Sequence, residues 1–205
     1  MRHGCQMEVR ATPYLEHASR VRPCQGEEVS GDTVFFRPLE EGLFVAIVDV
    51  LGHGPQAHEL AIVIEEFLAD SGRADIASEI ASLHEHLKGT RGAAVGFCEI
   101  NAAEGRAAYV GTGNTVMRRF GKTNTRLISQ DGILGQNMRT PRPQTLQLEP
   151  EDLIVLYTDG VHDRFTVDDY PSIFHHSPKN VARTIVERFG KSYDDAACIA
   201  VRYAP

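Results

Sequence analysis

The chain has 205 residues and a formal net charge of -7 at pH 7, with 42% hydrophobic and 24% charged residues. This length and composition predict one globular domain over residues 1–205 with a sizeable core. The acidic balance disfavours nucleic acids and anionic membranes as partners, because both require clustered Lys and Arg. The longest apolar run, residues 43–51, is too short to cross a bilayer, and the N-terminus has no apolar signal core. We therefore expect a cytoplasmic protein.

The first half of the chain is predicted to form strands and then two helices. Strand patterns occur at residues 8–14, and at 33–36 and 43–48, where the turn at residues 40–42 predicts a hairpin. A helix is expected from Pro55 to Asp70, because apolar residues recur on one face and Pro suits the first turn. A second helix is expected between an Asp75 cap and Gly89.

The second half changes to the period of strands and has one further helix. Strands are expected at residues 93–100, 107–111, 116–120, 125–128, 145–148, 153–157 and 196–202. The helix is expected to begin at Ser177-Pro178 and to end at Gly190. Because the strands follow one another in hairpin order and the helices are grouped, we predict the α+β class. The expected architecture is an αββα layered sandwich of two antiparallel sheets with helices on the outer faces.

Four aspartates stand at the ends of strongly apolar strands. Asp49 and Asp159 directly follow such strands, Asp194 lies just before the last strand, and Asp32 lies directly before the strand at 33–36. Each one alone is a common turn residue. Placing a charged carboxylate at the end of a buried strand costs free energy unless a counter-charge neutralises it. Four carboxylates that converge at one edge would also repel one another. All-oxygen ligands favour hard divalent cations, so we predict a site for Mg²⁺ or Mn²⁺.

The glycines beside these aspartates and the absence of other motifs indicate the chemistry. Gly52, Gly54 and Gly160 permit tight turns that bring backbone oxygens as well as carboxylates to a cation. Two cations about 3.5–4 Å apart would hold a hydroxide for in-line attack on phosphorus, which requires no nucleophilic side chain. Accordingly, the sequence contains no Cys-x5-Arg loop, no Walker loop and no Gly-x-Ser-x-Gly elbow.

The cysteines and histidines give weaker indications. Cys5, Cys24, Cys98 and Cys198 have no C-x-x-C spacing, and we interpret them as buried structural thiols rather than as a disulfide or a catalytic thiol. None of the histidines has the local spacing of a zinc site. His53, in the turn after Asp49, is a candidate proton donor to the leaving group, for which we favour a supporting role. His162 is expected on a loop surface.

Motifs around the four aspartates carry a family resemblance. They are Ser30-Gly31-Asp32, Asp49-Val50-Leu51-Gly52-His53-Gly54, Tyr157-Thr158-Asp159-Gly160 and Asp194-Asp195-Ala196-Ala197. Their order and separation resemble those of the PPM superfamily of metal-dependent protein phosphatases. The resemblance is to the bacterial branch that includes SpoIIE, RsbU and RsbX, and is closest to RsbX. It implies that Asp49 bridges two metals with help from the Val50 carbonyl, that Asp159 and Asp194 bind the second cation, and that Asp32 lies among or just behind the ligands.

The resemblance also implies an activity and a partner. The expected enzyme is a protein-serine/threonine phosphatase with two divalent cations, Mn²⁺ or Mg²⁺, and catalytic residues Asp49, Asp159 and Asp194. Its expected substrate is a phosphorylated STAS-domain protein of a stress-signalling complex, and a monomer is favoured. Two alternatives stay open at this point. One is a catalytically silent regulator of the same fold that binds a phosphorylated partner, and the other is a two-metal hydrolase of small phosphoesters.

Overall fold

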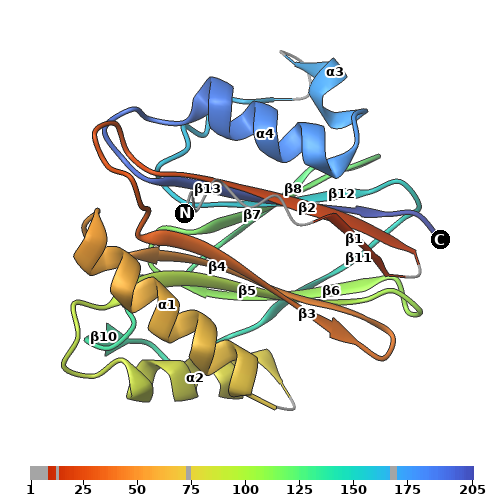
Figure 1. Ribbon diagram of the computed structural model, residues 1–205. Coiled ribbons are helices and arrows are strands. Elements are labelled where there is room, and N and C mark those ends of the chain that lie inside the picture. Colours follow the sequence, from red (N-terminus) through yellow and green to blue (C-terminus); the bar gives the residue numbers. More distant parts are fainter. Residues whose placement is uncertain (1–8, 13, 73–74, 167–169) are drawn as a thin grey trace.

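Two antiparallel sheets lie face to face, with helices on both outer faces. The computed structural model describes residues 9–12, 14–72, 75–166 and 170–205, and Figure 1 shows its four layers. One sheet has the order β11-β6-β5-β4-β3 and the other has the order β1-β2-β13-β12-β7-β8. A short pair, β9 and β10, forms a separate two-stranded sheet. This arrangement confirms the predicted αββα sandwich.

Most of the predicted strands occur close to their predicted bounds, whereas β2, β9 and β10 were not predicted. The five-stranded sheet consists of β3 (Asp32–Leu39), β4 (Gly42–Val50), β5 (Ala93–Asn101), β6 (Arg106–Thr112) and β11 (Gln144–Gln147). The six-stranded sheet consists of β1 (Val9–Thr12), β2 (Leu15–Arg22), β7 (Val116–Phe120), β8 (Thr125–Ile128), β12 (Leu153–Tyr157) and β13 (Ala196–Tyr203). The short pair consists of β9 (Gly132–Ile133) and β10 (Asn137–Met138).

The three longer helices, α1, α2 and α4, begin where the sequence predicts them, whereas the short α3 was not predicted. α1 (Pro55–Asp70) and α2 (Ile76–His86) cover the five-stranded sheet, while α3 (Pro171–Phe174) and α4 (Pro178–Phe189) cover the six-stranded sheet (Figure 1). The Asp75 side chain accepts a hydrogen bond from the Ser78 amide and caps α2. α2 ends at His86, three residues before Gly89, the stop expected from the sequence. α4 ends at Phe189, directly before Gly190, the stop predicted from the sequence.

Burial explains why the apolar pattern of β4 is continuous. Alternate residues of this strand face opposite ways, so that Phe44, Ala46 and Val48 pack under α1 and α2. Leu43, Val45 and Ile47 pack between the two sheets. A third cluster, around Val181 and Ile185 of α4, fills the space between that helix and the six-stranded sheet. A central strand with both faces in a core requires apolar residues at every position.

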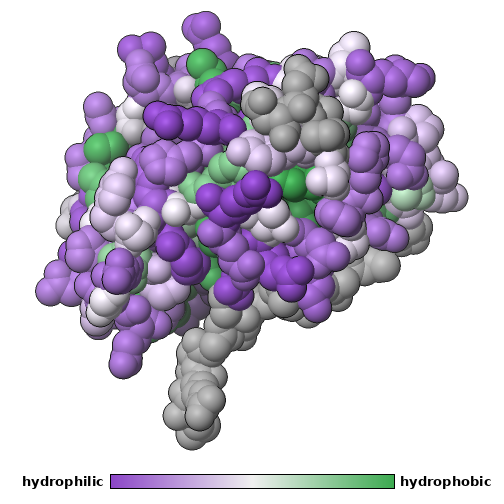
Figure 2. Space-filling view, turned by 90° about the horizontal axis from the view of Figure 1, so that it is seen from above, coloured by the Kyte–Doolittle hydropathy of each residue, from purple (hydrophilic) through white to green (hydrophobic). Residues whose placement is uncertain are grey.

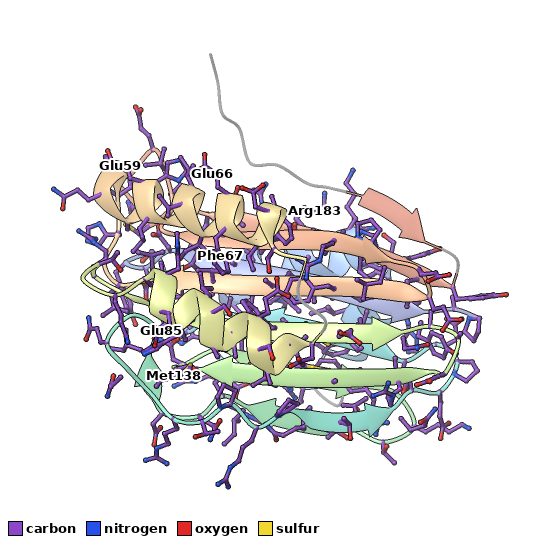
Figure 3. The ribbon with its side chains drawn as sticks, turned by 90° about the horizontal axis from the view of Figure 1, so that it is seen from below. Glu59, Glu66, Phe67, Glu85, Met138 and Arg183 are labelled. Atoms are coloured by element: carbon purple, nitrogen blue, oxygen red, sulfur yellow. The ribbon has the colours of Figure 1, made fainter. Side chains whose placement is uncertain are left out.

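The outer faces of the helices are mostly polar, although Ile62 and Val63 of α1 are exposed. Figure 3 shows Phe67 between α1 and α2, where its ring lies 4.8 Å from that of His86, and shows Glu59, Glu66 and Glu85 at the outside. On the α4 side, Figure 2 shows mostly hydrophilic side chains with small apolar areas between them. Within the described part of the chain, no helix has the length and apolar character needed to span a membrane.

β2 is the main element that the sequence prediction misses. The prediction placed one strand at residues 8–14, whereas the structure has β1 and then a separate eight-residue strand, Leu15–Arg22. The inward-facing positions of β2 include the polar residues His17 and Ser19, which hide the apolar alternation. His17 is nevertheless 2% exposed, because its ring packs 4.8 Å from the ring of Phe36 on the facing sheet.

Cys24, Cys98 and Cys198 are free and buried, as predicted, whereas Cys5 lies outside the described residues.

Candidate metal centre

One end of the sandwich gathers the predicted aspartates from both sheets. Asp32 and Asp49 lie directly opposite each other in the antiparallel pair of β3 and β4. Asp159 comes two residues after β12, and Asp194 comes two residues before β13. β12 and β13 are themselves paired, with Tyr157 opposite Cys198, so these two carboxylates also leave the sheet at one end. Residues far apart in sequence thus meet at one place.

Three of these aspartates line one open cavity. Asp49, Asp159 and Asp194 contribute to a hollow of about 500 Å³, together with Asn114 and Asp131. Its described lining contains neither His53 nor His162. Nothing in the structure therefore supports either histidine as a proton donor at this cavity.

Two further predicted residues lie behind the cavity wall. Asp32 is 4% exposed, and its Oδ2 accepts a hydrogen bond of 2.7 Å from the Thr158 hydroxyl. The Val50 side chain is fully buried in the core under α1, and the Val50 amide donates to the Gly31 carbonyl. Its carbonyl as a metal ligand stays a prediction.

Burial and neighbouring carboxylates raise the pKa values of Asp32, Asp49 and Asp194. Burial, followed by the charges of Asp159 and Asp194, raises the pKa of Asp49 to about 7, against a partly offsetting hydrogen bond from Asn114. Burial and then the Asp49 charge raise the pKa of Asp32 well above its usual range. Burial and the Asp159 charge raise the pKa of Asp194, which the Lys191 charge partly offsets. The ionised forms are therefore unfavourable here without a counter-charge.

The donor set fits divalent cations. Among the described residues, no Lys or Arg forms an ion pair with Asp32, Asp49, Asp159 or Asp194. Like charges directly opposite in a sheet are destabilising, as are buried carboxylates without compensation. Hard cations such as Mg²⁺ and Mn²⁺ prefer carboxylate and carbonyl oxygens, and their charge would remove this repulsion.

Tight backbone contacts hold the loops that carry the carboxylates. A Cβ at Gly160 would lie 1.7 Å from the Asp195 carbonyl oxygen, so only glycine lets the turn after Asp159 approach the segment before β13. On the other side, the Arg91 guanidinium donates to the Leu51 carbonyl at 2.9 Å, and the Leu51 amide donates to the Gly92 carbonyl. These bonds fix the turn that follows Asp49.

Three residues at the site escaped the sequence analysis as functional candidates. Thr158 is fully buried, and its hydroxyl joins Asp32 to the Ala197 amide. Asn114 bonds to Asp49. Asp195 accepts the Cys24 and Gly31 amides, each at 2.7 Å, and thereby holds the segment between β2 and β3. The sequence shows that Asp194 and Asp195 are adjacent. Only the structure shows that Asp194 lines the cavity, whereas Asp195 is a buried hydrogen-bond acceptor.

This separation gives a prediction. Asp195→Ala is expected to lower the free energy of unfolding by about 2–4 kcal/mol, because two buried amides lose their acceptor. Urea denaturation in EDTA measures this change. Asp194→Ala is the matched control, because Asp194 faces the cavity and carries unfavourable charge, so its stability is expected to change by less than about 1 kcal/mol. Equal losses in the two variants would contradict the assignment.

A family model matches most of the chain. The model described as Stage II sporulation protein E (SpoIIE) matches residues 40–204, which include Asp49, Asp159 and Asp194. The chain belongs to the SpoIIE family. Among curated proteins, no sequence matches this SpoIIE-family chain significantly.

Solved structures place this SpoIIE-family member in the PP2C-type phosphatase fold. One matching chain comes from a study of the bacterial stressosome as a modular system adapted to control secondary messenger signaling. It is 25% identical in sequence, with a TM-score of 0.84, and the match covers 92% of this chain and 99% of that chain. RsbX in complex with magnesium is 19% identical, with a TM-score of 0.81 over 97% of this chain and 100% of its own. The catalytic domain of the serine/threonine protein phosphatase PstP, with 2 manganese ions, is 15% identical, with a TM-score of 0.70 over 93% and 99%.

Proposed function

We propose that residues 1–205 form a single catalytic domain that removes phosphate from serine or threonine of a partner protein with the help of two divalent cations, Mn²⁺ or Mg²⁺. The observation that carries this proposal is the meeting of Asp49, Asp159 and Asp194 in one open cavity, with Asp32 buried beside Asp49 and with no basic partner among the described residues. Membership of the SpoIIE family and the magnesium and manganese in the RsbX and PstP structures support it.

Each residue has a defined part in this proposal. Asp49, which lines the cavity, would hold both cations together with the Val50 carbonyl. Asp159 and Asp194 would hold the second cation, and Asp32, which lies opposite Asp49 in the β3–β4 pair, would support Asp49 from behind. When bound, the cations activate water and stabilise the charge that develops during in-line displacement at phosphorus. Asn114 orients the Asp49 carboxylate, and Thr158 fixes Asp32, so that the ligands are positioned before substrate arrives.

The same proposal includes a substrate class. The chain that shares 25% identity comes from a study of the bacterial stressosome. This supports a phosphorylated STAS-domain protein of a stress-signalling complex as the substrate, and a cytoplasmic location. The cavity is open and carries mostly acidic and small side chains, so it offers little to grip a small phosphoester. A protein substrate can instead contribute binding energy away from the phosphate.

The substrate proposal is tested by comparing phosphoesters at fixed Mn²⁺. Phosphate release is measured with a phosphorylated STAS-domain protein, an unrelated phosphoserine protein and p-nitrophenyl phosphate. The kcat/KM for the STAS protein is expected to exceed that for p-nitrophenyl phosphate by at least about 100-fold, which corresponds to about 2.7 kcal/mol of additional transition-state binding.

Two other outcomes are informative. Equal, low kcat/KM values for all three substrates would contradict the STAS assignment and favour a general phosphoester hydrolase. Binding of the phosphorylated STAS protein without any turnover, whichever cation is supplied, would contradict the enzyme and favour the silent regulator.

A further inference from the structure

A tight turn after β2 brings two potential ligands together. The Glu27 amide donates to the Cys24 carbonyl at 3.2 Å, which closes a four-residue turn. Gly26, the third residue, has a φ of 98°, as a type II turn requires at that position. The turn is anchored, since the Cys24 amide donates to Asp195 Oδ1 at 2.7 Å. Cys24 and Glu27 are therefore the first and last residues of a turn whose backbone is held in place, which brings their side chains close together.

The turn that follows Asp49 supplies a third ligand. His53 Nδ1 lies 3.0 Å from Glu27 Oε1. A Cβ at Gly54 would lie 2.8 Å from Glu27 Oε2, so the glycine leaves room for this carboxylate against the turn. One ligand atom from each of Cys24, Glu27 and His53 lies within 4.8 Å of the other two.

We propose that Cys24, Glu27 and His53 form a separate site for one borderline transition-metal ion, of which Zn²⁺ is the type. A sulfur, an imidazole nitrogen and a carboxylate oxygen are zinc ligands, whereas Mg²⁺ and Mn²⁺ prefer all-oxygen sets such as the aspartate cavity. The sites therefore differ in the class of ion they select.

The burial of the three side chains suits a metal ion with three protein ligands and a fourth coordination position open to water. Cys24 is 5% exposed, and the Glu27 and His53 side chains are 28% and 57% exposed. The buried thiol forms the floor, and the exposed histidine leaves the outer side to water, as in zinc sites with three protein ligands. Binding releases the Cys24 thiol proton to solvent. The bound ion would join the segment after β2 to the turn after Asp49.

Cobalt(II) is the probe for this site, because a thiolate–Co²⁺ bond gives a charge-transfer band that an all-oxygen site lacks. Titration of the full chain with Co²⁺ is expected to produce this band with one equivalent bound, and Zn²⁺ is expected to abolish it. Cys24→Ser is expected to remove the band. His53→Gln, at an exposed position, and Glu27→Gln, at a half-buried one, are expected to weaken Co²⁺ binding at the thiolate site by at least about tenfold.

Two matched variants separate this site from other ligands. Cys5→Ser is expected to keep the band, which shows that the thiolate is not supplied by the N-terminal cysteine. Asp159→Asn is also expected to keep the thiolate–Co²⁺ band, so the test of this site does not depend on the aspartate cavity. Absence of the band in the wild type, its persistence in Cys24→Ser, or its loss in Cys5→Ser would overturn the proposal. Circular dichroism shows whether each variant is folded.

Discussion

Asp49→Asn is expected to reduce Mn²⁺-dependent phosphatase activity by about three orders of magnitude or more. Asp49 lines the cavity with Asp159 and Asp194 and lies directly opposite Asp32 in the β3–β4 pair. An amide there keeps the shape of the side chain but removes the charge that attracts both cations. Bound cations supply several kcal/mol of transition-state stabilisation, and each 1.36 kcal/mol lost is a tenfold loss in rate. Phosphate release from a phosphoserine protein at saturating Mn²⁺ measures the effect.

The control for this variant neutralises a different aspartate. Asp70 lies exposed at the end of α1, and it contributes nothing to the described lining of the aspartate cavity. Asp70→Asn is expected to keep the wild-type rate within about twofold, since surface substitutions change little. Substantial activity in Asp49→Asn, with a metal requirement like that of the wild type, would show that Asp49 is not a central ligand.

The metal-free protein is expected to lose stability as pH rises from about 4 to 7, and cations are expected to restore it. The pKa of Asp49 is raised to about 7 in the folded chain, whereas an unfolded Asp has a pKa of about 3.9. The native state therefore binds the proton more tightly than the unfolded state. Protonation favours folding at low pH, and this advantage disappears as pH rises through the folded pKa. The raised pKa values of Asp32 and Asp194 act in the same direction.

The measurement compares urea unfolding of wild type and Asp49→Asn at pH 5.5 and pH 8, in EDTA and in Mn²⁺. In EDTA at pH 8, Asp49→Asn is expected to be more stable than wild type by about 1–3 kcal/mol, with a smaller difference at pH 5.5. In Mn²⁺ at pH 8 the order is expected to reverse, because only the wild type gains the full binding energy. Because other groups, including nine histidines, also titrate, the variant difference is the decisive quantity. A variant less stable than wild type in EDTA at both pH values would contradict the account.

The sequence predicted the layers and the cavity aspartates for identifiable reasons. β4 and β12 are buried on both faces, so their apolar runs are continuous. Asp49 and Asp159, at the ends of these runs, are therefore easily recognised in the sequence. α1 begins at a proline and α4 ends before a glycine, and both signals act locally. Strands in hairpin order with helices grouped outside them leave few arrangements other than a layered sandwich.

What the sequence did not reveal depends on contacts between distant segments. β2 places His17 and Ser19 in the interior, which breaks the expected alternation. Asp194 and Asp195 are adjacent and chemically identical, yet one lines the cavity while the other binds two amides of the segment after β2. His53 and Glu27 are 26 residues apart, so no spacing rule joins them. Such pairings follow from how the two sheets stack, which local patterns do not specify.

The most direct test of the central proposal is phosphate release from a phosphoserine protein by the purified chain, measured with Mn²⁺, after EDTA, and after Mn²⁺ is restored. The proposal predicts turnover with Mn²⁺, its loss in EDTA and its full recovery on readdition. Turnover that persists in EDTA would contradict a metal-dependent mechanism. A folded chain that releases no phosphate with Mn²⁺ or Mg²⁺ would contradict the phosphatase function itself.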